Sequence, residues 1–382
     1  MGEALNCTAL QKAQRILGNF LNKTAIASIL FSFSRFAEAA KSFDEKPYTL
    51  STSLEASPMY TLVGITDWGA DILRVYGITT IVLVFVFLTV AIPTIYALWK
   101  FKARGDETEL PKQFTGNHFL ELMWTIIPVG LLLVISIPTW EVIFKQSNKA
   151  SNTDNFHVKV IGHQWWWEFQ YPDLGITTAN ELHLPENTPI DFSITSDDVI
   201  HSFYVPRFGG KIDAIPGVIN HIYLTTPELV KKDKVGGDFY QGHCLELCGS
   251  SHALMRFEAF IHSKAEFDKW AKSAMNPPEV LSAQEKRGEE VFAQCQACHT
   301  IAGTVSAKIP GKKLGPDLTN FGNRRYLGAT TRLNTVENFH KWIKNSSLIK
   351  PGSKMTSFEG ILTDQQIDDV AAYVRISTSK KF

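Results

Sequence analysis

The chain has 382 residues, which corresponds to two or three domains at ~150 residues per domain. Its 38 basic and 38 acidic side chains cancel, so the composition gives no sign of a nucleic-acid-binding protein, and a hydrophobic content of 45% excludes a disordered chain. Five cysteines are too few for a disulfide scaffold, and four of them form two closely spaced pairs that indicate metal or cofactor attachment.

The charge is unevenly distributed along this neutral chain. Residues 151–279 carry 10 basic and 17 acidic side chains, a net charge of −7, whereas residues 280–382 carry 15 basic and 9 acidic side chains, a net charge of +6. Opposite potentials steer two parts of a chain toward each other, so we expect the second part to dock on the first. Net charge alone does not locate the surfaces that meet.

The first 39 residues are typical of a secretory signal peptide. Three basic residues precede an apolar stretch at 25–33, and the tripeptide Ala-Glu-Ala at 37–39 resembles a signal-peptidase site. We therefore expect residues 1–39 to be a signal peptide, whose cleavage also removes Cys7.

Two uncharged runs predict a pair of membrane-spanning helices within residues 68–145. The run at 75–99 would be roughly 37 Å long as a helix and the run at 122–140 about 28 Å, close to the ~30 Å thickness of a hydrocarbon core. Buried helices of a globular protein rarely stay uncharged over such a length. The loop between the runs is basic, which predicts that it is cytoplasmic and that everything after Glu141 lies outside the cytoplasm.

Residues 155–262 show the pattern of a β domain. Apolar and polar residues alternate at 157–161 and at 189–195, and 257–261 is a short apolar strand. Gly and Pro mark turns at 171–173, 208–210 and 215–217. Many short strands at this spacing predict an all-β Greek-key sandwich or barrel.

A metal site is predicted at the end of this β region. Cys244, Cys248, His252 and Met255 fall within twelve residues, and His201 stands in an earlier turn. Thiolates and a thioether are soft ligands that select copper, or zinc in a closed tetrahedral site. Met255 favours copper, because Met is the usual weak axial ligand of electron-transfer copper. Two cysteines with two imidazoles suit two copper ions bridged by both sulfurs, and a structural zinc site is the alternative.

A haem site is predicted in the tail. Cys295, Cys298 and His299 form C-x-x-C-H, the haem c attachment motif, in which each thiol adds to a vinyl group and the histidine becomes the proximal ligand. The later Met355 fits the Met/His ligation of cytochromes c. Gly-Pro-Asp-Leu at 315–318 resembles the loop whose proline carbonyl orients the proximal histidine.

The tail is predicted to be a separate helical domain over residues 279–382. One helix at 284–293 leads into the haem motif, and a final helix starts at Thr363 as its cap. The proline-containing segment 273–278 is predicted to be the linker before this domain. Met275 is excluded as the haem ligand because it lies in that linker.

The copper motif resembles that of a known family. C-x-E-x-C-G-x-x-H-x-x-M at 244–255, with D-V-x-H-S upstream, resembles the dinuclear copper (CuA) site of cytochrome c oxidase subunit II. The resemblance runs from about residue 68 to 270 and includes the aromatic cluster at 162–167. It implies a multi-domain chain with a two-helix transmembrane hairpin and a cupredoxin domain at 152–270. With the tail, the chain resembles subunit II of caa-type haem-copper oxidases, which carries a fused class I cytochrome c domain, all-α in fold.

The resemblance also implies roles for individual residues. The implied copper ligands are His201, Cys244, the backbone carbonyl of Glu246, Cys248, His252 and Met255. The Glu246 carboxylate would help to bind magnesium at the interface with subunit I. Trp165 would be the electron-entry residue, and Glu121 would lie at the mouth of a proton channel. Val218 departs from the family pattern, which has Arg at this position, so one polar contact is missing there.

The implied function is electron entry into a terminal oxidase. Haem c would accept electrons from a cytochrome c or a membrane complex, and CuA would pass them to haem a of subunit I, where dioxygen is reduced and protons are pumped. The implied location is the bacterial inner membrane, with both soluble domains on the periplasmic or extracellular side and with subunit I, other oxidase subunits and lipid as partners. One alternative is the haem c subunit of a nitric-oxide-reductase-like complex, which would lack the two-cysteine loop. The others are a membrane-tethered structural zinc protein with a separate cytochrome and a quinol-oxidase subunit, which lacks the copper cysteines.

Overall fold

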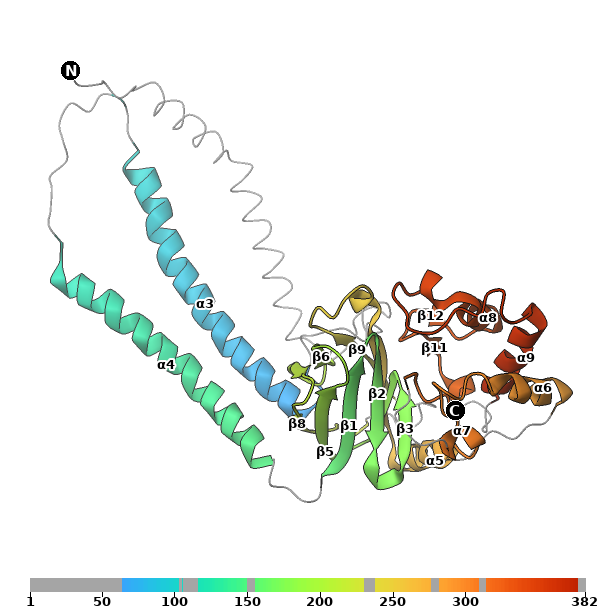
Figure 1. Ribbon diagram of the computed structural model, residues 1–382. Helices are drawn as coiled ribbons and strands as arrows, with labels where there is room; N and C mark the ends of the chain where they lie inside the picture. The colour runs from blue at the N-terminus through green and yellow to red at the C-terminus, as the bar shows by residue number, and fades with distance from the viewer. Residues whose placement is uncertain are drawn as a thin grey trace. The chain divides into compact units, whose positions relative to one another are not determined.

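The computed structural model contains two long helices, a β domain and a mainly helical tail (Figure 1). The residues that it describes are 64–102, 105, 116–149, 155–229, 238–275, 282–308 and 314–376. The expected signal peptide at 1–39, with Cys7, lies outside the described residues and stays a prediction.

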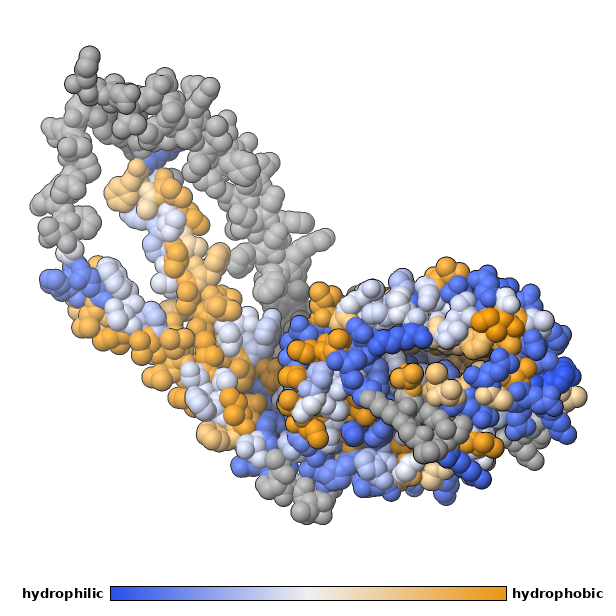
Figure 2. Space-filling view, in the orientation of Figure 1, coloured by the Kyte–Doolittle hydropathy of each residue, from blue (hydrophilic) through white to orange (hydrophobic). Residues whose placement is uncertain are grey.

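The two predicted apolar helices are confirmed. Helix α3 (Asp67–Lys100) has 34 residues and helix α4 (His118–Lys149) has 32. Both are long and apolar enough to cross a membrane by length and composition, and their apolar side chains are exposed along most of their length (Figure 2). Each exceeds the uncharged run on which it was predicted, because polar residues continue the helix beyond the apolar segment. Pro93 and Pro128 lie inside the helices without ending them.

Polar contacts join the start of α3 to the end of α4 and to the β domain. Three ion pairs join α3 to α4, namely Asp67 with Lys149, Asp71 with Lys145 at 2.6 Å, and Arg74 with Glu141 at 3.3 Å. Asp67 also accepts a hydrogen bond from the Thr225 backbone N–H at 2.9 Å. The hydroxyl of Thr66, which caps α3, donates to the carbonyl of Phe208. The start of α3 is therefore attached to the β domain.

The β domain is a sandwich of two five-stranded sheets, as the alternating pattern predicts. The first sheet, in spatial order, contains β3 (Ile176–Ala179), β2 (Trp166–Tyr171), β1 (Phe156–His163), β5 (Pro189–Ser196) and β8 (Asn220–Thr225). The second contains β4 (Glu181–Pro185), β10 (Arg256–His262), β9 (Asp238–Cys244), β6 (His201–Tyr204) and β7 (Ile212–Ala214). Both sheets are mixed, since β1 pairs in parallel with β5 and β10 in parallel with β4.

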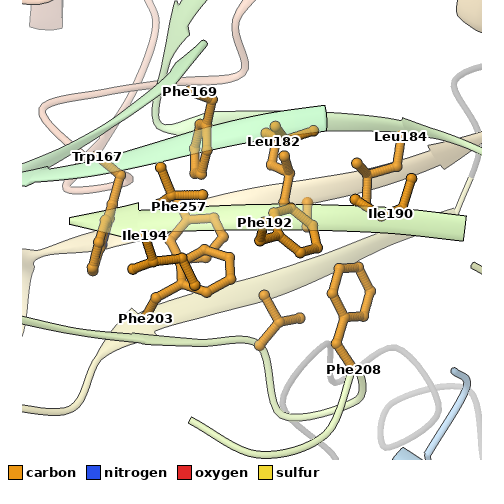
Figure 3. Packing of buried hydrophobic residues seen from close by; sticks show 14 of the residues in the cluster. Trp167, Phe169, Leu182, Leu184, Ile190, Phe192, Ile194, Phe203, Phe208 and Phe257 are labelled. Atoms are coloured by element: carbon orange, nitrogen blue, oxygen red, sulfur yellow. The ribbon is translucent and has the colours of Figure 1, made fainter. Parts of the chain in front are cut away.

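The core of the β domain lies between the sheets and is rich in aromatic side chains (Figure 3). Alternate residues of β2 point inward, so Trp167 and Phe169 are fully buried. They meet rings from the second sheet: Trp167 lies 5.6 Å from Phe203, and Phe169 lies 5.3 Å from Phe257, between ring centroids. Such tilted aromatic pairs add to the free energy of burial and fix how the sheets face each other.

Helix α5 (Lys264–Met275) corrects the predicted domain boundary. It packs Phe267, Trp270 and Ala271 on the β-domain core, and Ser273 is also buried. The predicted linker at 273–278 therefore begins too early, and the predicted end of the β domain at residue 270 falls inside a helix. Residues 276–281, where the paired prolines lie, are outside the described part.

The tail has its own hydrophobic core around three main helices. Its elements are α6 (Ala283–Phe292), α7 (Val305–Lys308), β11 (Tyr326–Leu327), β12 (Arg332–Leu333), α8 (Val336–Asn345) and α9 (Asp364–Val374), with 3₁₀ turns η3 (Phe321–Asn323) and η4 (Ser346–Leu348). Thr363 caps α9 as predicted, and its hydroxyl and the Gln366 side chain form a capping box. Within the described tail, a ladder of two residues per strand, β11 with β12, accompanies the helices.

Helices α6 and α9 lie close together at Gly288. A Cβ added at Gly288 would lie 2.0 Å from the carbonyl oxygen of Asp369, which is backbone and cannot move aside cheaply. Arg287 strengthens the same crossing, because its guanidinium donates to the Asp369 carboxylate at 2.8 Å and 3.0 Å.

We predict that Gly288→Ala destabilises the tail by about 1–2 kcal/mol in total, because overpacking against backbone costs toward the upper end of about 1–3 kcal/mol. The higher helix propensity of Ala, worth about 1 kcal/mol, acts in the opposite direction. A net decrease in the free energy of unfolding would therefore be due to the clash. Denaturant unfolding followed by haem absorbance measures the effect, and Glu289→Ala, at an exposed position of α6, is the control. Equal stability of the two variants would show that the helices do not cross so closely.

Candidate metal and haem sites

The predicted copper ligands converge on one cluster in the β domain. The Sγ atoms of Cys244 and Cys248 are 3.7 Å apart. His201 Nδ1 lies 3.8 Å from Cys244 Sγ and His252 Nδ1 lies 3.5 Å from Cys248 Sγ, so each sulfur has an imidazole beside it. Met255 Sδ is 3.8 Å from Cys248 Sγ. Except for the half-buried His252, these side chains are almost fully buried.

Strand pairing brings the two distant parts of the cluster together. His201 begins β6 and Cys244 ends β9, and these strands are neighbours in the second sheet, with Phe203 opposite Cys244. The Leu245 N–H continues the pairing by donating to the Ser202 carbonyl at 3.1 Å. Residues more than forty positions apart in sequence are therefore fixed side by side by backbone hydrogen bonds.

A tight loop supplies the other ligands. The Cys244 N–H donates to the Met255 carbonyl at 3.1 Å, which closes the loop between them. Gly249 adopts φ +114, a conformation that favours glycine, and a Cβ there would lie 3.0 Å from the indole of Trp165. Within this loop the Glu246 carbonyl oxygen lies 3.2 Å from Cys244 Sγ, so a backbone oxygen joins the donor set.

The aspartate of the D-V-x-H turn orients one imidazole. Asp198 Oδ1 is 2.9 Å from His201 Nε2. Burial opposes ionisation of this aspartate, but hydrogen bonds from His201 and from the Gln164 N–H hold the pKa of the carboxyl well below its usual range. The ionised carboxylate favours the proton on Nε2, so the lone pair of Nδ1 faces the sulfur atoms. This is the arrangement by which proteins orient metal-binding histidines.

The two thiols of the cluster differ in acidity: the hydrogen bond to Cys244 and burial raise the pKa of the Cys248 thiol, whereas that of Cys244 is lowered. A hydrogen bond from Cys248, assisted by contacts with His201 and backbone N–H groups, lowers the pKa of the Cys244 thiol well below its ordinary value. Thiolate is the form that binds metals. The two soft sulfurs, two imidazoles and a thioether fit copper, as the donor set of the sequence predicts.

Trp165 lies directly behind the cluster. Its indole N–H donates to the Cys248 carbonyl at 2.9 Å, and the Gln164 side-chain amide donates to the same oxygen at 2.8 Å. Trp165 is only 7% exposed. The next residue, Trp166, instead stacks on His163 with ring centroids 4.1 Å apart.

The predicted proximal histidine has the expected support in the tail. His299 Nδ1 lies 2.8 Å from the carbonyl oxygen of Pro316. A Cβ at Gly315 would lie 2.5 Å from the imidazole, so only glycine fits beside this ring. Burial lowers the pKa of His299, which keeps the ring neutral, and the Pro316 carbonyl accepts from Nδ1 and leaves Nε2 available to a metal.

The other predicted haem-binding residues also belong to the tail core. Cys295 and Met355 pack against it, and Cys298 is half-buried. The His299 N–H donates to the Cys295 carbonyl at 2.9 Å, so the C-x-x-C-H segment forms a compact turn after α6. A thiol pair, a neutral imidazole and a thioether in one small core fit a covalently attached haem.

Glu121 lies in the first turn of α4. Its carboxylate is 3.1 Å from His118 Nδ1, and its side chain is 43% exposed. This position at the start of an apolar helix agrees with an interfacial location, and its role stays a prediction.

Three residues that support these sites, Asp198, Gly315 and Gln164, are not among the predicted ligands. Asp198 belongs to the D-V-x-H-S segment and Gly315 to Gly-Pro-Asp-Leu, and the three-residue spacing from Asp198 to His201 could have identified the carboxylate–imidazole pair. Gln164 gave no such signal, because its acceptor is a backbone carbonyl 84 residues away.

Three family models match the chain. The model described as cytochrome c oxidase subunit II, transmembrane domain, matches residues 69–142, and the model for the periplasmic domain of the same subunit matches residues 174–260. The cytochrome c model matches residues 285–377. These matches cover the helix pair, most of the β domain and the tail in the same order.

Curated relatives agree with these models. The chain is 38% identical over 283 residues to cytochrome c oxidase subunit 2 of Bacillus sp. (strain PS3), covering 72% of this chain and 78% of that protein. It is 34% identical over 288 residues to the same subunit of Alkalihalophilus pseudofirmus, covering 73% of this chain and 79% of that protein. The solved periplasmic domain of subunit II of cytochrome oxidase from Bradyrhizobium japonicum is 31% identical, covering 32% of this chain and 95% of that chain, with a TM-score of 0.29.

We predict that Met355→Ala leaves haem attached through Cys295 and Cys298 but removes its sixth ligand. An axial Met raises the haem potential, so the variant should have a lower midpoint potential and a high-spin or ligand-binding reduced form. Optical redox titration measures both effects. Met275→Ala is the matched control, because this exposed methionine ends α5. A low-spin spectrum that Met355→Ala leaves unchanged would indicate another axial residue.

Proposed function

Because the chain belongs to the cytochrome c oxidase subunit II family and ends in a cytochrome c domain, we propose that it is the electron-entry subunit of a haem-copper terminal oxidase. In this proposal it accepts electrons from a cytochrome c or a membrane complex at its tail. It then passes them through a dinuclear copper centre to haem a of subunit I, where dioxygen is reduced to water and protons are translocated.

The observation that carries the proposal is the pair of sulfur atoms with one imidazole beside each. His201, Cys244 and Cys248 place their ligand atoms within 4.8 Å of one another, and His252 is not part of that group. A single tetrahedral zinc ion needs all four donors around one point. Two ions would suit the donors where they lie, because His201 stands beside Cys244 and His252 beside Cys248. The buried thioether of Met255 adds to the preference for copper.

The chain's own residues hold the carriers and exclude water from them. Bound copper and haem supply one-electron carriers whose oxidation states change without bond breaking in the protein. Asp198 fixes the His201 tautomer, and the Pro316 carbonyl does the same for His299. Because these ligands are held by backbone and buried side chains, they need little rearrangement when the charge of the site changes.

Three further roles belong to this proposal. Trp165 is the electron-entry residue, which its hydrogen bond to the Cys248 carbonyl supports. The half-buried Glu246 carboxylate would contribute to a magnesium site facing subunit I, and its carbonyl oxygen, 3.2 Å from Cys244 Sγ, would be a copper ligand. Glu121 marks the entrance of a proton channel at the start of α4.

The chain is an integral membrane protein of this family, with two apolar helices that match the subunit II transmembrane model. We propose that it resides in a bacterial inner membrane among subunit I, other oxidase subunits and lipid. The β domain and the tail would lie on the periplasmic or extracellular side, because the basic loop between the helices favours the cytoplasm.

We expect that Cys244→Ser or Cys248→Ser abolishes the dinuclear copper centre while haem c remains. Both thiolates bridge the two ions in this proposal, so neither can be replaced. Metal analysis and the near-infrared absorption of mixed-valence copper measure the loss. The reciprocal control, Cys295→Ser with Cys298→Ser, should lose covalent haem and keep copper. Two coppers per chain in either copper-site variant would refute the assignment.

Trp165→Ala should slow electron transfer into the copper centre and leave the copper content unchanged, because Gln164 still donates to the Cys248 carbonyl. Trp166→Ala removes the neighbouring indole, which stacks on His163, and should have little effect. Rapid-mixing reduction of each variant gives the rates. If Trp165→Ala transfers electrons at the wild-type rate with full copper loading, the indole serves only for packing.

A further inference from the structure

One lysine of the tail is buried against the β domain. Lys350 is only 4% exposed, and its ammonium donates to three backbone carbonyls. The acceptors are the carbonyls of Trp165 at 2.5 Å and Leu254 at 3.0 Å in the β domain, and that of Gly328 at 3.0 Å in the tail. An ammonium has three donors, so this arrangement uses all of them. Lysine is almost never this buried unless its charge is compensated.

The residues that follow Lys350 continue the contact. The Ser251 hydroxyl donates to the Pro351 carbonyl at 2.6 Å. Gly352 has φ +79, and a Cβ there would lie 2.7 Å from the ring of Trp165, so the backbone of the tail touches the indole directly. Lys354 lies 3.4 Å from the Asp198 carboxylate. We call residues 350–354 the docking loop.

A second contact surrounds Arg325 of the tail. Its guanidinium is 3.1 Å from the Glu258 carboxylate and lies over the ring of Phe239, 4.4 Å from the centroid. Its backbone N–H donates to Glu181 at 3.2 Å. The tail thus supplies the basic groups and the β domain the acidic ones, which is the polarity expected from their net charges.

We propose that the docking loop fixes the haem-bearing tail on the copper site of the same chain, with Lys350 as the positioning residue. This inference rests on the proposed function. Both β-domain acceptors of Lys350 lie beside a copper ligand: the indole of Trp165 donates to the Cys248 carbonyl, and Leu254 precedes Met255. The loop then leads directly into Met355, the expected haem ligand. The docking loop therefore connects the residues around the copper cluster to the expected haem ligand within six residues of chain.

The experiment compares Lys350→Met with Lys354→Met in the intact oxidase that contains this subunit. Both variants remove one positive charge from the docking loop and keep an unbranched stem. Lys350→Met leaves buried carbonyls without a donor, whereas Lys354 belongs to an ion pair in which its side chain is 62% exposed. Hydrogen–deuterium exchange of segments 163–167 and 350–354 reports the docking, and rapid reduction of haem followed by copper reports the transfer.

We expect exchange of both segments to be about tenfold faster in Lys350→Met, as the loss of a buried hydrogen-bonded charge implies, with slower transfer from haem to copper. Haem and copper spectra and midpoint potentials should stay as in the wild type, and Lys354→Met should change exchange and transfer far less than Lys350→Met, because an ion pair with an exposed partner contributes little. Unchanged exchange in Lys350→Met would overturn the proposal. Faster exchange with an unchanged transfer rate would also overturn it, because docking would then not position the carriers.

Two results separate this proposal from its premises. A wild-type protein without near-infrared copper absorption would refute the proposed function before any variant is compared. If Lys350→Met does not retain haem, Arg325→Met takes its place, since it removes the contact with Glu258 at the other edge of the same interface. The same increase in exchange and the same slower transfer are expected of it, and wild-type values would refute the docking.

Discussion

Two sulfur atoms held 3.7 Å apart are the constraint on which the rest of the site depends. Their separation is set by the pairing of β6 with β9 and by the loop that the Cys244–Met255 backbone hydrogen bond closes. The sandwich core lies directly beneath, where Trp167 packs against both His201 and Phe203. Because close-packed interiors deform little, a metal bound there meets ligands that are already in position. The β domain therefore acts as a rigid frame for a site built on its loops.

The sequence predicts the parts of this protein whose signals are local. C-x-x-C-H and the twelve-residue copper loop carry most of their ligands within a short segment, so spacing alone reveals them. Long uncharged runs and alternating strands are equally local. The prediction placed the linker at 273–278 because of the paired prolines, so it did not include the last residues of α5 in the β domain. Phe267, Trp270, Ala271 and Ala274 nevertheless follow the three- and four-residue spacing of a helix face, so the pattern could have extended the helix.

The interface between the tail and the β domain could not be predicted in the same way. Lys350 stands before Pro-Gly, a context typical of an exposed turn, and its acceptors in the β domain are backbone carbonyls 185 and 96 residues away. A backbone acceptor leaves no mark on residue identity, so no motif can indicate it. The net charges predict that the basic tail is attracted to the acidic β domain, but they identify no residue. Only the folded chain shows that the contact includes a buried ammonium besides the surface ion pairs.

The two kinds of contact at this interface respond differently to their surroundings. Pairs such as Lys354 with Asp198 are exposed, contribute little, and are screened by salt within a Debye length of about 8 Å at physiological ionic strength. Burial lowers the pKa of Lys350 to about 7, which shows how costly a charge is at this position, and three carbonyl oxygens accept the hydrogen bonds of the ammonium. Screening by salt acts weakly on such a buried group.

The covalent connection between the domains already keeps the tail at a high effective concentration, so attraction is needed mainly to select an orientation. A directional, buried contact beside Trp165 serves that purpose better than diffuse surface charge, which makes Lys350 rather than net charge the determinant of how the tail meets the copper site.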